Sequence, residues 1–233
     1  SVRAERGIAD EDVNAFVDAM ESDIDTDRYE TYADLEAYMD GSAAAVGRMM
    51  TAIMDLDAEA EATALPHATK LGEAFQMTNF LRDVREDVVE RDRIYIPLTT
   101  LRRHGVSEEQ ILDLEFDEDV AAAIRAELAR TERLYESGVA GIKYLPENCQ
   151  LAVLLAAVLY ADHHRLIRNL GYDTVSTTPE LSLTRKLSLL VRTRWKWQWN
   201  NDPERVFYEM SHGFDREHSQ HGHGRHDPTA LRT

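Results

Sequence analysis

Apolar residues recur every three or four positions along most of the chain, the spacing of one face of an α-helix. No stretch long enough for a sheet strand alternates with period two, so we expect an all-α fold. Capping residues, glycines and prolines divide this pattern into segments. The expected helices cover residues 11–21, 31–55, 68–91, a short stretch from Ser107, 117–144, 147–170 and 181–199, with 59–66 as a connector.

These helices are expected to form one domain over residues 1–210, without an internal repeat or an interdomain linker. Residues 211–233 are rich in His and Gly and are expected to form a flexible tail, because polar Gly-rich sequence cannot bury a core. Clustered histidines can also bind transition metals. The histidines concerned are His212, His218, His221, His223 and His226.

The charge of the chain restricts its partners. A formal net charge of -17 over 233 residues argues against a nucleic-acid partner, which requires clustered positive charge. The single cysteine, Cys149, excludes an internal disulfide and fits a reducing cytosol. The longest apolar run, 151–160, is about half the length of a membrane span. We expect a cytoplasmic protein with at most loose peripheral membrane contact, and no segment reads as a basic amphipathic helix that would provide that contact.

The same charge predicts a dependence on salt. Acidic side chains that repel one another in dilute buffer are screened in concentrated salt, which fits a protein that stays soluble there. We therefore expect a higher melting temperature, measured by circular dichroism, in molar KCl than in dilute buffer. A melting temperature that falls as KCl is added would contradict this prediction.

Three tryptophans near the end of the last expected helix occupy alternate positions, so they cannot share one face. They are Trp195, Trp197 and Trp199. At least one of them is expected to be exposed, toward a partner or a membrane surface.

The strongest functional signal is the stretch QMTNFLRDVREDVVERDRIYIP, which ends at Pro97. It contains no Gly or other Pro, and we expect it to run as one helix. A polar stripe then lies beside an apolar face, within roughly 80° of arc. The stripe consists of Gln76, Asn79, Asp83, Asp87 and Glu90.

Asp83 and Asp87 are four residues apart and point the same way, so they repel each other unless a cation lies between them. Two carboxylates with open lone pairs suit a hard cation such as Mg²⁺, which keeps most of its waters and bridges to phosphates. A solvated acidic face is the alternative. The amides of Gln76 and Asn79 favour the cation site, since a solvating face has no need of them.

The stretch resembles the second aspartate-rich motif of the squalene/phytoene synthase family, the head-to-head prenyltransferases. That motif reads Q-x-x-N-x-x-R-D-x-x-E-D, followed by a basic residue, Tyr, any residue and Pro. Residues 28–50, 159–173 and 181–190 resemble further helices of the family, so the likeness extends to about residue 200, and it is closest to phytoene synthases of salt-loving archaea. The matching motif residues are Gln76, Asn79, Arg82, Asp83, Glu86, Asp87, Arg93, Tyr95 and Pro97.

The resemblance implies an isoprenoid synthase helical bundle. It also implies that two geranylgeranyl diphosphates condense through a cyclopropyl diphosphate to phytoene, with Mg²⁺ or Mn²⁺ as cofactor. Asp83 and Asp87, with Asn79, would hold the metal and bring the substrate diphosphate to it. Arg82 and Arg93 would clamp phosphate oxygens. Arg82 projects off the stripe, however, and an ion pair with a neighbouring acid is an equally good role for it.

The remaining implied site residues are polar or aromatic. Tyr38 would present its ring to a carbocation and is counted as catalytic with the two aspartates. Gln76 would orient the diphosphate, while Tyr95 and Tyr160 would contact the substrate or simply pack. Asp23 matches a family aspartate near the site mouth, although a solvated loop explains it equally well.

The small residues 41–47 have two interpretations. In the family, such a run borders the cavity that takes the isoprenoid tail. From the residues alone, close packing of two helices is the better explanation, and the resemblance favours the cavity.

The chain departs from the family pattern in two places. The first aspartate-rich motif, D-x-x-x-D, is absent, so we expect the C-terminal part of a longer protein with exposed apolar surface. Thr177 and Thr178 stand about where the family has a diphosphate-binding Arg. The alternatives are squalene or dehydrosqualene synthesis from farnesyl diphosphate, a prenyl-diphosphate-binding remnant without turnover, and a purely structural acidic helical protein.

Overall fold

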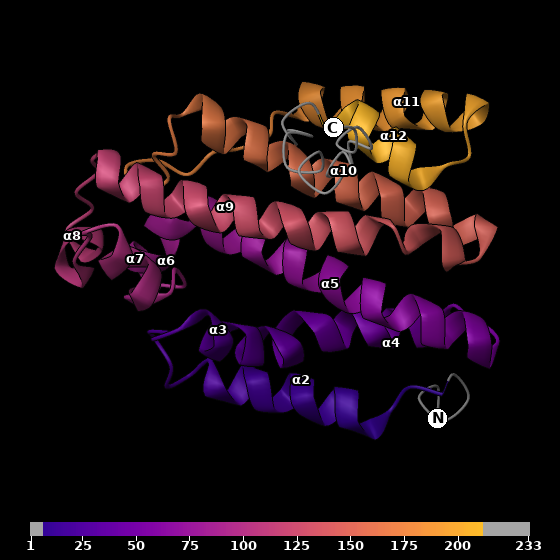
Figure 1. The fold of residues 1–233 in the computed structure, drawn as a ribbon, viewed down its shortest axis with the longest axis horizontal. Helices are drawn as coiled ribbons and strands as arrows, with labels where there is room; N and C mark the ends of the chain where they lie inside the picture. Colours follow the sequence, from indigo (N-terminus) through magenta and orange to yellow (C-terminus); the bar gives the residue numbers. More distant parts are fainter. Residues whose placement is uncertain (1–6, 212–233) are drawn as a thin grey trace, which may run out of the picture.

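The computed structural model describes residues 7–211, and over this range the chain is helical (Figure 1). Its only strand-like pairing there is an isolated parallel bridge between Arg28 and Ile94. The all-α prediction is therefore confirmed, and the His-rich tail lies outside the described residues. In chain order the elements are α2 (Asp10–Ser22), α3 (Tyr32–Met39), the π-helical turn η1 (Asp40–Ala44), α4 (Ala45–Ile53), α5 (Ala58–Arg82), α6 (Val84–Arg91), α7 (Leu98–Arg103), α8 (Glu108–Leu112), α9 (Glu118–Val139), the 3₁₀ turn η2 (Ile142–Tyr144), α10 (Glu147–Asn169), α11 (Leu183–Trp199) and α12 (Pro203–Met210).

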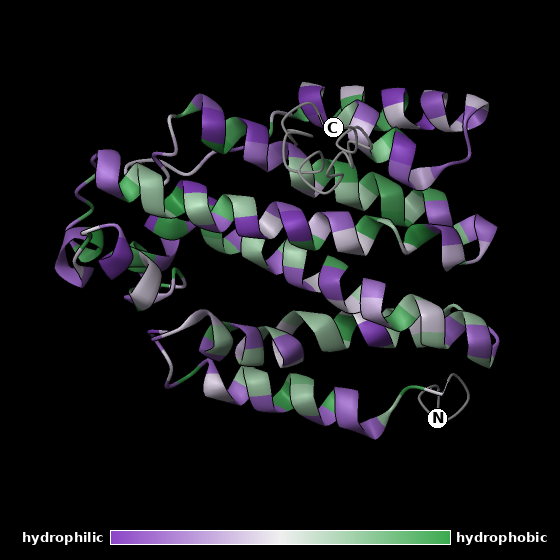
Figure 2. Ribbon diagram, viewed as in Figure 1, coloured by the Kyte–Doolittle hydropathy of each residue, from purple (hydrophilic) through white to green (hydrophobic). Residues whose placement is uncertain are grey.

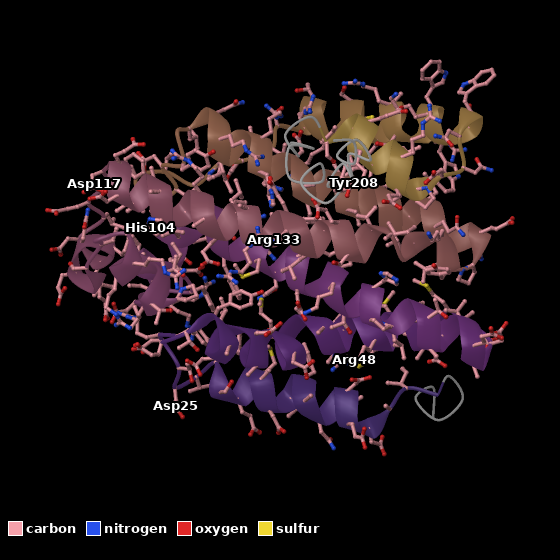
Figure 3. The ribbon with its side chains drawn as sticks, in the orientation of Figure 1. Asp25, Arg48, His104, Asp117, Arg133 and Tyr208 are labelled. Carbon is pink, nitrogen blue, oxygen red and sulfur yellow. The ribbon has the colours of Figure 1, made fainter. Side chains whose placement is uncertain are left out.

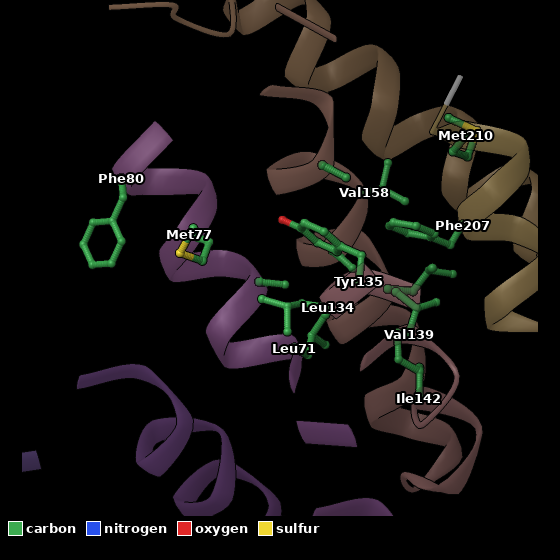
Figure 4. Close-up of a cluster of buried hydrophobic side chains, with 14 of the residues drawn as sticks. Leu71, Met77, Phe80, Leu134, Tyr135, Val139, Ile142, Val158, Phe207 and Met210 are labelled. Atoms are coloured by element: carbon green, nitrogen blue, oxygen red, sulfur yellow. The ribbon is translucent and has the colours of Figure 1, made fainter. Parts of the chain in front are cut away.

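The long helices lie roughly side by side, and the short helices α6, α7 and α8 gather at one end (Figure 1). Helix α5 occupies the middle and contacts α4, α9 and α10. Each helix carries both hydrophobic and hydrophilic patches along its length, so it can turn an apolar face to its neighbours (Figure 2). One buried cluster joins α5, α9, α10 and α12 around Tyr135 and Phe207 (Figure 4). A second cluster, around Leu81 and Ile124, supports the end that carries the short helices.

Several helix starts agree with the sequence. Thr31 and Asp34 form a capping box where the helix from residue 31 was expected to begin, and Ser107 and Asp117 cap α8 and α9. The predicted connector 59–66 was wrong, because the Asp57 side chain accepts from the amides of Glu59 and Ala60 and starts α5 there. Helices α7 and α12 were not predicted, since each is too short to show a periodic pattern.

The predicted single helix 68–91 is interrupted at Asp83, whose backbone (φ −100°, ψ 18°) separates α5 from α6. The amide of Arg85 donates to the Thr174 carbonyl at 3.1 Å, in the loop between α10 and α11. This bond takes the amide away from the carbonyl four residues earlier, which explains the break. Asp83 still donates to the Asn79 carbonyl and Asp87 to the Asp83 carbonyl, each at 2.8 Å, so the two helices remain nearly continuous.

The run 41–47 forms η1 and the start of α4, and it packs closely against its neighbours. A Cβ on Gly47 would lie 2.6 Å from the Ala68 carbonyl oxygen, and one on Gly72 would lie 2.7 Å from that of Ala43. Close packing of α4 on α5 thus requires these glycines. Gly47 and Gly72 also border an apolar cavity of about 90 Å³. The run therefore serves packing, and only its last residue, Gly47, borders this small cavity.

Apolar surface is exposed on α4, at Val46, Met50 and Ile53, as expected from the sequence. Among the described helices, none is long and apolar enough to cross a bilayer.

Candidate functional site

The two motif aspartates lie at the break between α5 and α6, and each is paired with an arginine. Nε of Arg82 donates to Oδ1 of Asp83 at 2.6 Å, and a second guanidinium nitrogen contacts Oδ2. On the next turn, Arg91 donates to Oδ1 of Asp87 at 2.7 Å. The ion-pair alternative for Arg82 is therefore present in this structure. The arginines neutralise a pair of carboxylates that would otherwise repel each other.

Asp87 is the more buried of the pair, with 6% of its surface exposed. Burial raises the pKa of its carboxyl from 3.8 to about 6. The Arg91 guanidinium opposes this rise, and the negative charges of Asp83 and Glu86 add to it. Burial thus destabilises the ionised form of Asp87, and a bound cation would stabilise that form.

The raised pKa predicts how stability changes with pH. A carboxyl whose pKa is raised by folding stabilises the native state while protonated, and this contribution is lost as pH rises from 3.8 through about 6. Asp87→Asn mimics the protonated carboxyl at every pH. In a chelator, we expect the variant to gain up to about 3 kcal/mol over the natural protein between pH 4 and pH 7. Urea unfolding at several pH values measures the gain, and a pH-independent difference would contradict the prediction.

After α6 the chain turns back along the site. Asp92 adopts the left-handed conformation (φ 51°), which Asp tolerates at a helix C-terminus. The amide of Arg93 donates to the Asp87 carbonyl at 3.1 Å, and the amide of Ile94 donates to the Asp27 carbonyl at 3.0 Å. Residues 92–97 are thereby held between α6 and the loop that precedes α3.

Asp23, in that loop, is the common acceptor of this part of the site. Its Oδ1 accepts from the Tyr38 hydroxyl at 2.9 Å and from Arg93 at 2.8 Å, with Tyr95 Oη at 3.4 Å. Arg93 also donates to the Asp23 carbonyl and contacts the Tyr95 hydroxyl at 2.9 Å. The structure thus brings together three predicted site residues, Tyr38, Arg93 and Tyr95, through an aspartate whose role the sequence left open.

Four aromatic rings form a cluster behind these polar groups. Tyr95 stacks on Phe80 with ring centroids 3.7 Å apart, and its ring lies 5.8 Å from Tyr29 and 6.2 Å from Tyr38. Burial raises the pKa of the Tyr38 and Tyr29 phenols well above the ordinary value, and that of Tyr95 is also raised. These phenols therefore stay neutral at physiological pH, where they can donate hydrogen bonds and offer electron-rich faces to a cation.

Three predicted residues lie apart from the Asp23 contacts. Tyr160 on α10 stacks against Phe75 with centroids 4.5 Å apart. Gln76 and Asn79 are half-buried, and within residues 7–211 their side-chain amides make no hydrogen bond. Both amides are thus available to a ligand.

The donor set at the break suits a magnesium ion, which does not require a closed cage of protein ligands. Within residues 7–211, no three His, Cys, Asp or Glu side chains group closely enough to hold a metal by themselves. Mg²⁺ is usually held by one or two carboxylates together with waters and substrate phosphates. Asp83 and Asp87, with the amide of Asn79 nearby on α5, fit that requirement.

Sequence reasoning missed Phe80 and Tyr29 as parts of the site. By helical spacing Phe80 falls on the apolar face beside the polar stripe, where it reads as a core residue, and Tyr29 follows three closely spaced aspartates that resemble an ordinary acidic loop. The only sequence signal for the aromatic cluster is the presence of tyrosines at positions 29, 38 and 95, next to the polar residues of the candidate site.

The fold is that of a helical isoprenoid synthase. The structure aligns with that of a dehydrosqualene synthase at a TM-score of 0.72 and 28% identity, covering 82% of this chain and 66% of that one. The family model for squalene/phytoene synthase matches residues 1–192. The chain therefore belongs to the squalene/phytoene synthase family, as the sequence indicated.

Individual relatives match over similar regions. The chain is 37% identical to a phytoene synthase of Thermus thermophilus over 169 residues, which is 72% of this chain and 56% of that protein. It is 32% identical to a 15-cis-phytoene synthase of Synechocystis over 177 residues, 72% of this chain and 52% of that protein. The chain thus spans about half the length of these relatives.

Proposed function

We propose that this chain carries the second aspartate-rich half of a phytoene synthase site, which condenses two geranylgeranyl diphosphates head to head through a cyclopropyl diphosphate. Two diphosphates leave and two protons are lost, one as the cyclopropane ring closes and one as the central double bond of phytoene forms. The observation that carries the proposal is the Asp83 and Asp87 pair at the α5–α6 break, adjoining the segment that leads into a buried aromatic cluster. The phytoene synthases among the relatives support the choice of reaction.

Asp83 and Asp87, with Asn79, would hold Mg²⁺, and Mn²⁺ suits the same donors. When bound, the metal neutralises the diphosphate, so that the allylic C–O bond can ionise. In this structure Arg82 forms an ion pair with Asp83, and Arg91 forms one with Asp87. Displaced by the cation, Arg82 would be free to bind phosphate oxygens, as a guanidinium does readily.

The chain's other residues would act on the organic part of the substrate. Tyr38 and Tyr95 present neutral rings, which stabilise an allylic cation without giving it a base. Asp23 and Arg93 hold both hydroxyls in place. Gln76 would orient the diphosphate, and Tyr160 would contact the isoprenoid.

Incubation with geranylgeranyl diphosphate or farnesyl diphosphate and Mg²⁺ tests the proposal, with release of diphosphate and extracted hydrocarbon as readouts. Phytoene from the first substrate is the expected result. Dehydrosqualene or squalene from the second would favour the alternative that the dehydrosqualene synthase structure supports. Substrate binding without release of diphosphate would favour a binding protein without turnover.

A further inference from the structure

Helix α11 carries an exposed apolar stripe. Large apolar residues stand at every fourth position, so successive members turn by about 40° and the row winds through about 160° of arc over roughly 25 Å. The row consists of Leu183, Leu187, Val191, Trp195 and Trp199. All five are more than half exposed, with Trp199 at 78%. Aromatic side chains project outward at this end of α11 in Figure 3.

The charge of α11 is opposite to that of the protein. The segment contains five basic residues and no Asp or Glu, in a chain with a net charge of -17. Lys186, Arg192 and Arg194 have no ion-pair partner among the described residues. By helical geometry, Arg192 projects about 60° to one side of Trp195 and Arg194 about 100° to the other. The exposed face is thus both apolar and cationic, which corrects the expectation that the chain has no basic amphipathic helix.

The rest of α11 is firmly attached to the bundle. Leu189 is buried in the main core, and Arg185 makes a two-pronged ion pair with Asp162 of α10 at 2.6 and 3.0 Å. Lys196 donates to Glu209 of α12 at 2.5 Å. These contacts hold the helix so that the stripe faces away from the protein, and it need not rearrange to meet a surface.

We propose that α11 docks the protein on a membrane, lying in the plane of a bilayer whose headgroups are anionic. An interfacial helix needs an apolar face that enters the headgroup region and basic residues that meet lipid phosphates. Tryptophan is enriched at this depth. Charge complementarity favours lipid over a second copy, because two α11 helices paired face to face would bring their unpaired guanidinium groups together. The α4 surface lacks this character, since its one basic residue, Arg48, pairs with Asp12 and Asp40.

Vesicle flotation tests the proposal with vesicles of phosphatidylcholine alone or mixed equally with phosphatidylglycerol. We expect binding to the mixed vesicles, weakened about tenfold or more by W195S/W199S. R192Q/R194Q should lose about fivefold per charge in dilute salt and much less in molar KCl, where phosphate attraction is screened. The matched controls V17S/M20S, on the exposed apolar face of α2, and R103Q, on α7, should bind like the natural protein.

Acrylamide quenching of the W197F variant distinguishes lipid from a protein surface as the partner that covers the stripe. The fluorescence of this variant comes from Trp195 and Trp199 alone. Both tryptophans should be open to quencher without lipid and protected by mixed vesicles. Protection without lipid would mean that another protein surface covers the stripe, and a dimer lost in W195S/W199S would identify that surface as a second copy. Either result overturns the proposal, as does a folded protein that floats with neither vesicle.

Discussion

Replacing Asp83 or Asp87 with asparagine is expected to weaken Mg²⁺-dependent binding of diphosphate at least about 100-fold, measured by calorimetry with inorganic diphosphate. Each substitution removes one of two carboxylates that a hard cation requires at this position. The loss is expected to be similar for the two positions, because the single remaining carboxylate competes poorly with water for Mg²⁺. Without Mg²⁺, the variants and the natural protein should bind diphosphate equally weakly.

Glu90→Gln is the matched control for both aspartates. Glu90 belongs to the same predicted stripe and carries the same charge, but it is exposed and lies 4.0 Å from Arg91. We expect its substitution to change the affinity less than about twofold, as for a surface carboxylate. Equal losses in the three variants would show that the site responds only to overall negative charge, and the specific role of Asp83 and Asp87 would be wrong.

Asp23→Asn is expected to destabilise the fold by about 2 kcal/mol, which lowers the melting temperature by roughly 4–8 °C in a protein of this size. The variant leaves Arg93, whose side chain is 9% exposed, without its carboxylate partner. Asp23 is itself one-third exposed, so water compensates part of the loss. The Asn side chain keeps one oxygen, so the Tyr38 hydroxyl exchanges a charged acceptor for a weaker neutral one.

Asp25→Asn provides the comparison in the same loop, because Asp25 is exposed. Its melting temperature should stay within about 1 °C of the natural protein, as expected for a surface substitution. If the two variants melt together, Asp23 does not join the loop to residues 92–97, and the arrangement of Tyr38, Arg93 and Tyr95 needs another cause.

Local signals predicted much of the fold. Thr31 with Asp34, and Asp117 alone, satisfy amides of their own helix, so they can be recognised without tertiary information. The break at Asp83 could not be predicted, because its cause is the Thr174 carbonyl, about ninety residues further along the chain. The start of α5 was missed because Pro66 was taken as a boundary, although the cap at Asp57 lies earlier.

The candidate site likewise contains residues that the sequence predicts and residues that depend on tertiary contacts. Asp83 and Asp87 follow from helical spacing and lie on consecutive turns despite the break. Asp23 depends on a loop that reaches residues 92–97 across more than sixty positions, and spacing alone cannot distinguish it from Asp25 or Asp27. The membrane-facing stripe was missed for another reason. Its basic and apolar residues interleave along α11, and their separation became visible only when Leu189 and Thr193 were seen to be buried.

A crystal structure with Mn²⁺ and an unreactive thio analogue of geranylgeranyl diphosphate would test the central claim most directly, because manganese is located by its anomalous scattering. We predict a manganese peak within bonding distance of the Asp83 and Asp87 carboxylates, with the analogue's diphosphate bound to it and Arg82 turned away from Asp83. A bound analogue with manganese elsewhere, or with both arginine pairs intact, would contradict the account.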